Sequence, residues 1–272
     1  MICPFYFNLK KIVKNMEKKS ESLVIVIMAA GKGTRMHSDK AKVLHSVCGR
    51  PMILHVVDTA TKIAGKAVVI VIGHQAEKVK AVVAKEAEVL FALQKEQKGT
   101  GHAVKAALPV LPENSSQVII LSGDVPLIKA DTVQTLLHLH LHQQNAVTVL
   151  GVQLEKPYGY GRILVNNAGD VDKIVEETDA TEAQKKITIV NSGVYCVHRE
   201  FLETSLMQLQ SNNKQNEIYL TDIVEIAKKH QKKIGLMICP NQNEVQGVNT
   251  PQDLLDVECM IHPKRPLLIR SP

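Results

Sequence analysis

Small residues and basic side chains follow the first strongly apolar run of the chain. The segment LVIVIMAAGKGTRM, residues 23–36, passes from β-branched residues into alanine and glycine, and Lys32, Arg35 and Lys42 lie within or just after it. Alanine and glycine let backbone N–H groups approach a ligand closely, and the three cations can surround phosphate groups. A buried strand that delivers such a loop is typical of phosphate binding. The segment therefore predicts a site for a nucleoside triphosphate.

Two better-known glycine motifs do not fit this loop. A P-loop requires four residues between its first glycine and a Gly-Lys-Ser/Thr triplet, and the spacing of Gly31 and Gly33 does not supply them. A dinucleotide-binding fingerprint requires glycine at position 36, where Met36 stands. An isolated Gly-x-Gly is more often an ordinary strand-to-helix turn. The arginine and the lysine that follow favour a phosphate-binding role instead.

A single carboxylate ends a second apolar run, VIILSGDVPL at residues 118–127. Pro126 stops the strand, so Asp124 is expected at the carboxyl edge of a sheet. An aspartate in such a place is commonly only a turn former. Beside a triphosphate loop, however, the same aspartate favours metal binding, because Mg²⁺ takes few protein oxygens and completes its shell with water and phosphate. We therefore predict Asp124 as a magnesium ligand.

A polar loop lies between these two segments. LQKEQKGTGHAV, residues 93–104, carries Gln94, Gly99 and Thr100 directly before a helical stretch. Glycine and threonine at a helix start can be plain capping residues. Together with the amide of Gln94 they also offer groups that can recognise the edge of a base, so the loop is a candidate base-recognition loop.

The elements that must position these residues alternate along the chain. Apolar runs predict strands at 24–28, 67–72, 89–92, 118–121, 146–152, 161–165, 189–197 and 234–239, and helical patterns fall at 51–64, 76–84, 101–108, 130–142, 199–209 and 220–229. This alternation predicts a layered α/β fold with a mixed, mainly parallel sheet. Ligands of such sheets bind at the carboxyl ends of the strands, where the glycine loop is expected.

Composition excludes several classes of protein. The chain has 272 residues, of which 45% are apolar, and no apolar run is long enough to span a bilayer. Its five cysteines show no C-x-x-C spacing and favour a reducing compartment. The first fifteen residues do not resemble a signal peptide. A cytoplasmic protein without a membrane span is therefore expected.

The net charge of +6 comes from the two ends of the sequence. Residues 1–22 and 262–272 are basic, whereas the charges between them cancel, so a general nucleic-acid surface is disfavoured. We predict a basic N-terminal tail at 1–22, one domain at 23–261 and a C-terminal tail at 262–272. Met16 is a possible alternative start.

Histidines alternate in LLHLHLH. In a helix His138 and His142 would share a face with the spacing of metal ligands. A third ligand is not evident, so a partly exposed helix face is expected, with no catalytic role.

A series of short motifs resembles the pyrophosphorylase half of the bacterial N-acetylglucosamine-1-phosphate uridyltransferases. They run in order from about 23 to about 256: AAGKGTRM with KVLH, LQKEQKGTGHA, SGDVPL, YGYGRI, IVEETDAT, VNSGVY, NEIYLTD and QGVNTPQDL. The resemblance implies a three-layer, Rossmann-like nucleotidyltransferase fold. It also implies the conversion of UTP and N-acetylglucosamine 1-phosphate to UDP-N-acetylglucosamine and pyrophosphate, for cell-envelope precursor and peptidoglycan synthesis.

The same resemblance implies roles for individual residues. Arg35 faces the leaving pyrophosphate and Lys42 bridges the phosphates, while Asp124 and Asn249 hold Mg²⁺. The implied nucleotide-binding residues are Ala29, Ala30, Gly31, Gly33, Gln94, Gly99, Thr100, Ser122 and Gly123, and the implied sugar-binding residues are Gly161, Glu176 and Asn191.

The sequence departs from the family pattern in three ways. Ile218 interrupts a tyrosine pair, and Ser122 stands at a position that is often aromatic. The hexapeptide repeats of the bifunctional relatives are missing from these 272 residues. Acetyltransferase activity and the family trimer built by those repeats are therefore not expected, and the oligomeric state stays open.

Three alternatives remain at this stage. A related nucleotidyltransferase could use CTP, GTP or another sugar phosphate. A non-catalytic regulatory module could share the fold, although Lys42 and Asp124 argue against it. A scaffold could act through the basic tails.

Overall fold

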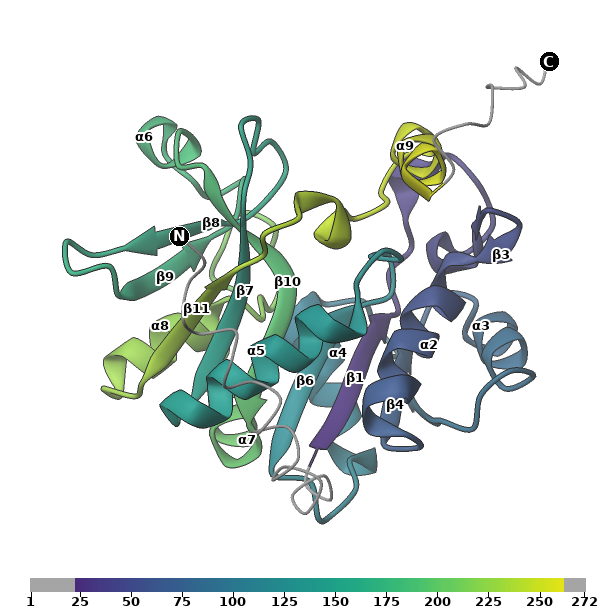
Figure 1. Ribbon diagram of the computed structural model, residues 1–272, viewed down its shortest axis with the longest axis horizontal. Coiled ribbons are helices and arrows are strands. Elements are labelled where there is room, and N and C mark those ends of the chain that lie inside the picture. Colours follow the sequence, from purple (N-terminus) through teal and green to yellow (C-terminus); the bar gives the residue numbers. More distant parts are fainter. Residues whose placement is uncertain (1–22, 262–272) are drawn as a thin grey trace, which may run out of the picture.

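The computed structural model describes residues 23–261, and Figure 1 shows a central sheet with helices against both of its faces. The two predicted tails and Met16 lie outside the described residues. Seven strands form the main path of the sheet in the order β11-β7-β10-β6-β1-β4-β5. They are β1 (Leu23–Ala29), β4 (Val68–Ile72), β5 (Leu90–Leu93), β6 (Gln117–Ser122), β7 (Val147–Gln153), β10 (Ile189–His198) and β11 (Ile234–Ile238).

Within the described part of this path, β10 alone runs antiparallel to its neighbours β6 and β7. The other pairs, β1 with β4 and β6, β4 with β5, and β7 with β11, are parallel. A hairpin of β8 (Arg162–Val165) and β9 (Val171–Val175) pairs with β10, and β2 (Ser46–Val47) and β3 (Arg50–Pro51) form a separate ribbon. The predicted mixed, mainly parallel sheet is thus confirmed.

The strand sequences explain why both faces of the sheet are covered. In β1, Ile25 and Ile27 pack into one core and Val24 and Val26 into the other, and all four side chains are fully buried. Side chains alternate between the two faces of a strand, so a continuous run of branched apolar residues requires a helix layer on each side. The sequence of β1 therefore specifies a three-layer arrangement.

One helix layer contains α2 (Met52–Ala64), α3 (Ala76–Val83), α5 (Ala130–Gln143) and α9 (Pro251–Ile261), whose buried residues join the first core. The other contains α4 (Thr100–Ala107), α7 (Arg199–Leu206) and α8 (Asp222–Lys229), which join the second. In Figure 1, α2 and α5 lie in front of the sheet. The short elements are α6 (Glu182–Lys185) and the 3₁₀ turns η3 (Thr34–Met36), η4 (Lys42–Leu44), η5 (Leu108–Val110) and η6 (Gln242–Val245).

Each strand and helix predicted from the sequence has a counterpart, with ends shifted by a few residues. The elements β9, α6, α9 and the β2–β3 ribbon were not predicted from the sequence. Helix α9 begins at Pro251 in a polar stretch, and the carboxylate of Asp253 accepts hydrogen bonds from the N–H groups of Asn249 at 2.9 Å and Thr250 at 2.8 Å. These bonds satisfy donors at the helix start, which apolar periodicity does not reveal.

The histidines of α5 separate into two environments. The rings of His138 and His142 stack with their centroids 6.2 Å apart, whereas His140 is buried and hydrogen-bonded to Thr148 Oγ1 and Gln117 Oε1. Across residues 23–261, no group of three or more histidine, cysteine, aspartate or glutamate side chains is arranged to hold a metal ion. None of the helices formed by these residues is both long and apolar enough to cross a membrane.

Candidate active site

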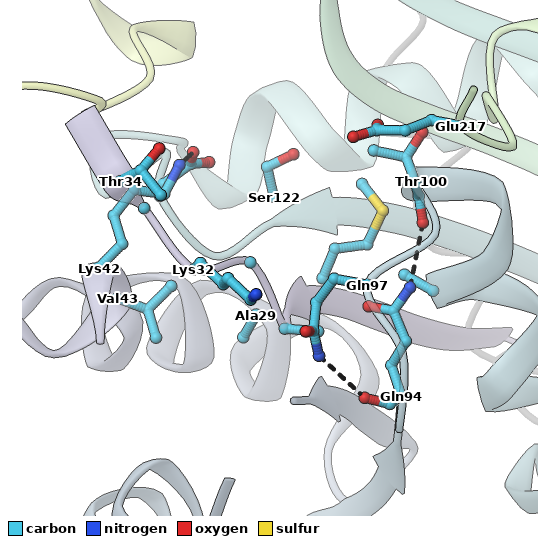
Figure 2. A pocket seen from close by; sticks show the side chains of 17 residues that line it. Ala29, Lys32, Thr34, Lys42, Val43, Gln94, Gln97, Thr100, Ser122 and Glu217 are labelled. Carbon is cyan, nitrogen blue, oxygen red and sulfur yellow. Dashed lines mark hydrogen bonds and ion pairs between the residues drawn. The ribbon is translucent and has the colours of Figure 1, made fainter. Parts of the chain in front are cut away.

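A cavity of about 490 Å³ opens at the carboxyl edge of the strands β6, β1, β4 and β5, and residues at the ends of β6, β1 and β5 line it. These four strands are parallel neighbours, so the segments that follow them meet at one edge of the sheet. Figure 2 shows side chains from all three predicted nucleotide segments around the cavity. The predicted residues that line it are Ala29, Ala30, Gly31, Gly33, Lys42, Gln94, Gly99, Thr100, Ser122 and Asp124, together with Lys32.

The glycine loop holds its shape through Gly33. This residue has φ 66° and ψ 43°, a left-handed conformation that glycine adopts without steric cost. A Cβ atom at this position would lie 2.5 Å from Cβ of Lys42. The side chain of Lys42 therefore packs directly over the glycine and is held against the loop. Gly123 also approaches the loop closely, and its N–H donates to the carbonyl of Met28 at 2.9 Å.

Four polar side chains from distant parts of the sequence meet beside the cavity. The ammonium of Lys42 forms an ion pair with Oδ2 of Asp124 and donates to Oδ1 of Asn249 at 3.1 Å. Arg35 donates to the same Asn249 oxygen at 2.9 Å. The N–H of Val248 donates to the carbonyl of Asp124 at 2.8 Å and fixes the segment that carries Asn249. We call Arg35, Lys42, Asp124 and Asn249 the cation cluster.

The cation cluster has a donor set that fits a magnesium ion. One carboxylate oxygen of Asp124 and the amide oxygen of Asn249 converge on a single positively charged atom, Nζ of Lys42. Mg²⁺ is bound in proteins by one or two such oxygens, and water and phosphate complete its coordination. The Asp124 side chain is 19% exposed, so water can reach it. The residues present therefore fit the metal that the sequence analysis predicted.

The predicted base-recognition loop lies on the other side of the cavity. Gln94 is 3% exposed, and its Nε2 donates to the carbonyl of Gly99 at 3.1 Å and lies 3.1 Å from Nδ1 of His102. Gly99 has φ 103°, and a Cβ atom there would lie 2.5 Å from the carbonyl oxygen of Ile218. The loop is thus tightly packed, and these contacts fix the orientation of the Gln94 amide.

The three predicted sugar-binding residues lie in one row at the ends of β8 and β9 and within β10. Arg162 of β8 pairs with Val190 of β10 and with Val175 of β9, both in antiparallel register. One position beyond these pairs lie Gly161, just before β8, Glu176, just after β9, and Asn191 of β10; we call these three residues the sugar row. The N–H of Asn191 donates to the carbonyl of Gly161 at 2.8 Å. Residues from three separate motifs are therefore neighbours.

The side chains of the sugar row are also held in place. Oε1 of Glu176 accepts a hydrogen bond from Thr221 at 3.1 Å. Burial raises the pKa of Glu176, and the hydrogen bond from Thr221 opposes that rise. A Cβ atom on Gly161 would lie 3.2 Å from Oε2 of Glu176, so only glycine leaves that carboxylate unobstructed. Oδ1 of Asn191 accepts from the N–H of Gly193 at 3.0 Å, and its Nδ2 lies 2.6 Å from the hydroxyl of Tyr195.

The structure groups the predicted residues into two sets. Lys42, Asp124 and most of the predicted nucleotide-binding residues line the cavity, whereas Arg35, Gly123, Asn249 and the sugar row do not. The sets approach each other at β10, where a Cβ atom on Gly193 would lie 3.1 Å from Oγ of Ser122. Gln97 and Glu217 line the cavity and were missed, although Glu217 lies in the quoted NEIYLTD motif; Figure 2 shows it near Thr100.

Comparison with known proteins gives the family. The nucleotidyl transferase family matches residues 24–256. The chain is 44% identical over 237 residues to the bifunctional protein GlmU of Desulfotalea psychrophila. This match covers 87% of this chain and 70% of that relative. It is 45% identical over 238 residues to GlmU of Thermoanaerobacter pseudethanolicus and covers 51% of that relative. For GlmU of Clostridium perfringens SM101 the identity is 46% over 236 residues, again covering 51%. The chain thus spans about half the length of these last two relatives.

Solved structures agree on the fold. A putative glucose-1-phosphate thymidylyltransferase from Bacillus anthracis has a TM-score of 0.69 at 18% identity, covering 88% of this chain and 95% of that one. HddC from Yersinia pseudotuberculosis has a TM-score of 0.64 at 18% identity, covering 87% and 98%. These likenesses support the three-layer α/β architecture. The family match over residues 24–256 and the similarity to the curated relatives show that the chain belongs to the nucleotidyl transferase family.

Proposed function

We propose that the protein joins UTP and N-acetylglucosamine 1-phosphate and releases pyrophosphate, giving UDP-N-acetylglucosamine for cell-envelope precursor synthesis. The observation that carries the proposal is the convergence of Arg35, Lys42, Asp124 and Asn249 beside a cavity whose far side presents Gln94. Similarity to the GlmU proteins supports the choice of substrates. The reaction is placed in the cytoplasm, where nucleoside triphosphates are found.

The chemistry requires charge to be neutralised more than it requires a side-chain nucleophile. A phosphate oxygen of the sugar phosphate attacks the α-phosphorus of UTP in line with the leaving pyrophosphate. Lys42 neutralises charge on the phosphates as a compact cation, and the planar guanidinium of Arg35 suits a two-pronged contact with pyrophosphate. Asp124 and Asn249 would hold Mg²⁺, which when bound stabilises negative charge on the phosphate oxygens.

The sugar row is suited to recognising hydroxyl and acetamido groups. The carboxylate of Glu176 can accept hydrogen bonds from sugar hydroxyls, and the amide of Asn191 can donate and accept. The missing Cβ atom of Gly161 leaves space beside the Glu176 carboxylate. Because the row adjoins Ser122 through Gly193, a sugar held there would present its phosphate toward the cation cluster.

A pyrophosphate-release assay tests this proposal. The protein is supplied with UTP, Mg²⁺ and N-acetylglucosamine 1-phosphate, and in parallel with glucosamine 1-phosphate or with CTP or GTP. We expect release to be fastest with UTP and the acetylated sugar. No release with that pair would refute the proposed function, and faster release with another pair would reassign the substrates.

A further inference from the structure

Arg162 is a buried cation in the YGYGRI motif that the proposed chemistry does not use. Its side chain is 2% exposed, and it forms an ion pair with Oε2 of Glu177 at 2.5 Å. Its guanidinium also donates to the carbonyl of Tyr160 and, at 3.3 Å, to the carbonyl of Lys185 in α6. Removing a guanidinium from water is costly unless its partners are well placed. The arginine therefore constrains the three segments that supply those partners.

Two of these segments adjoin the sugar row in sequence. Arg162 follows Gly161 directly, and its ion-pair partner Glu177 follows Glu176 directly. Arg162 also pairs in register with Val190, the residue before Asn191. Arg162 therefore adjoins Gly161 in sequence, and its register partners Val190 and Val175 directly precede Asn191 and Glu176.

The ion pair reaches the backbone on both sides of the row. Oε2 of Glu177 accepts the N–H of Gly159 at 3.3 Å as well as the guanidinium of Arg162. The loop before Gly161 and the turn after Glu176 are therefore tied to a single carboxylate. Successive side chains of a strand point to opposite faces, so Arg162 supports the row from the face opposite to Glu176. A side chain that is 2% exposed does not contact the substrate.

We infer that Arg162, through its ion pair with Glu177, is a positioning residue for the sugar phosphate. The inference rests on the proposed function. The pair holds the backbone at Gly161 and the carboxylate of Glu176 at a fixed separation, so that the sugar is presented in one orientation. Its loss should weaken sugar recognition and leave the nucleotide side of the site intact.

Kinetics of Arg162→Met and of a matched control test this inference. Arg199 supplies the control, because it also pairs with a carboxylate, Glu203 at 2.7 Å, and donates to a carbonyl, Pro112 at 2.6 Å, but at the opposite edge of the sheet. We expect Arg162→Met to raise KM for N-acetylglucosamine 1-phosphate about tenfold or more, with KM for UTP changed less than about twofold. Arg199→Met should change neither constant. Arg162→Lys should restore part of the sugar affinity, because it keeps the charge beside Glu177.

Hydrogen exchange provides a readout that does not depend on turnover. Arg162→Met should accelerate amide exchange at residues 158–161 and 176–179, and Arg199→Met should not. If Arg162→Met does not fold, Glu177→Gln removes the ion pair with little change in shape and should give the same kinetic split. An unchanged KM for the sugar phosphate, or equal increases for both substrates, would overturn the inference.

The two proposals can fail separately. If the unmodified protein releases no pyrophosphate from UTP and N-acetylglucosamine 1-phosphate, the proposed function fails. Amide hydrogen exchange of Arg162→Met then tests the inference about Arg162 separately. Faster exchange confined to residues 158–161 and 176–179 supports the positioning role, and unchanged or uniformly faster exchange refutes it.

Discussion

Replacing Gly33 by alanine would test whether the glycine loop positions Lys42 or only turns the chain. Gly33 has φ 66° and ψ 43°, and a Cβ atom there would lie 2.5 Å from Cβ of Lys42. Ordinary contact between such atoms begins near 3.4 Å. The alanine methyl group therefore has to push the stem of Lys42 away by about 1 Å, which moves its ammonium relative to Asp124 and Asn249.

Two separate effects follow from this geometry. A left-handed alanine costs about 1–2 kcal/mol of stability. A displacement of about 1 Å in a catalytic group costs about 100-fold in turnover. Gly33→Ala should therefore fold, with a modestly lower free energy of unfolding, and release pyrophosphate about 100 times more slowly than the unmodified protein.

Gly169→Ala is the matched control. Gly169 has φ 88°, and a Cβ atom there would meet nothing within 4 Å. It should lose a similar amount of stability in urea denaturation but keep its turnover. If Gly33→Ala retains turnover within about threefold of Gly169→Ala, Lys42 is not positioned by its contact with the glycine, and the reasoning fails.

Three further predictions concern the cation cluster, the base loop and a buried histidine. Lys42→Ala or Asp124→Ala should each lower turnover about 100-fold or more, because electrostatic stabilisation by one well-placed group is commonly worth about 3–4 kcal/mol; near-normal pyrophosphate release would refute the assignment. Gln94→Ala should weaken UTP binding about 10-fold or more in equilibrium titration while KM for the sugar phosphate stays unchanged, since its amide is anchored to the Gly99 carbonyl in the base loop. Burial lowers the pKa of His140 to about 4, so between pH 6.5 and 4 the unfolded chain binds a proton that the folded protein does not. Stability should therefore fall by about 2 kcal/mol from pH 7 to pH 5 through this residue, and urea denaturation of His140→Gln at both pH values should lack that part of the change.

The layered fold could be predicted because its strands are continuous apolar runs. Strands such as Val68–Ile72 are buried along their whole length, and a run of branched apolar residues of this length is typical of a strand covered on both faces. Strand β9, VDKIV, carries Asp172 and Lys173 at partly exposed positions, so its pattern is interrupted. Helix α6 has four residues and shows no apolar period, but Thr181 and Gln184 form a capping box that marks its start.

The candidate site could be predicted only where its residues follow strands directly. Asp124 and the glycine loop end parallel strands, so general rules place them at one edge of the sheet. Asn249 lies 207 residues from Lys42, and nothing in its own segment indicates their contact. Its position became a prediction through the family resemblance. The support that Arg162 gives to the sugar row depends on strand register, which the residue types do not specify.

The order in which the cation cluster appears along the chain has a consequence for synthesis on the ribosome. Arg35 and Lys42 emerge early, Asp124 midway, and Asn249 more than 200 residues after Arg35. Contacts between residues so far apart form late in folding, because a long loop must close before they contribute. A nascent chain that stops before Asn249 can bury the core of its parallel strands, yet it lacks the oxygen that Arg35 and Lys42 share. Completion of the site therefore waits until translation has passed the η6 turn.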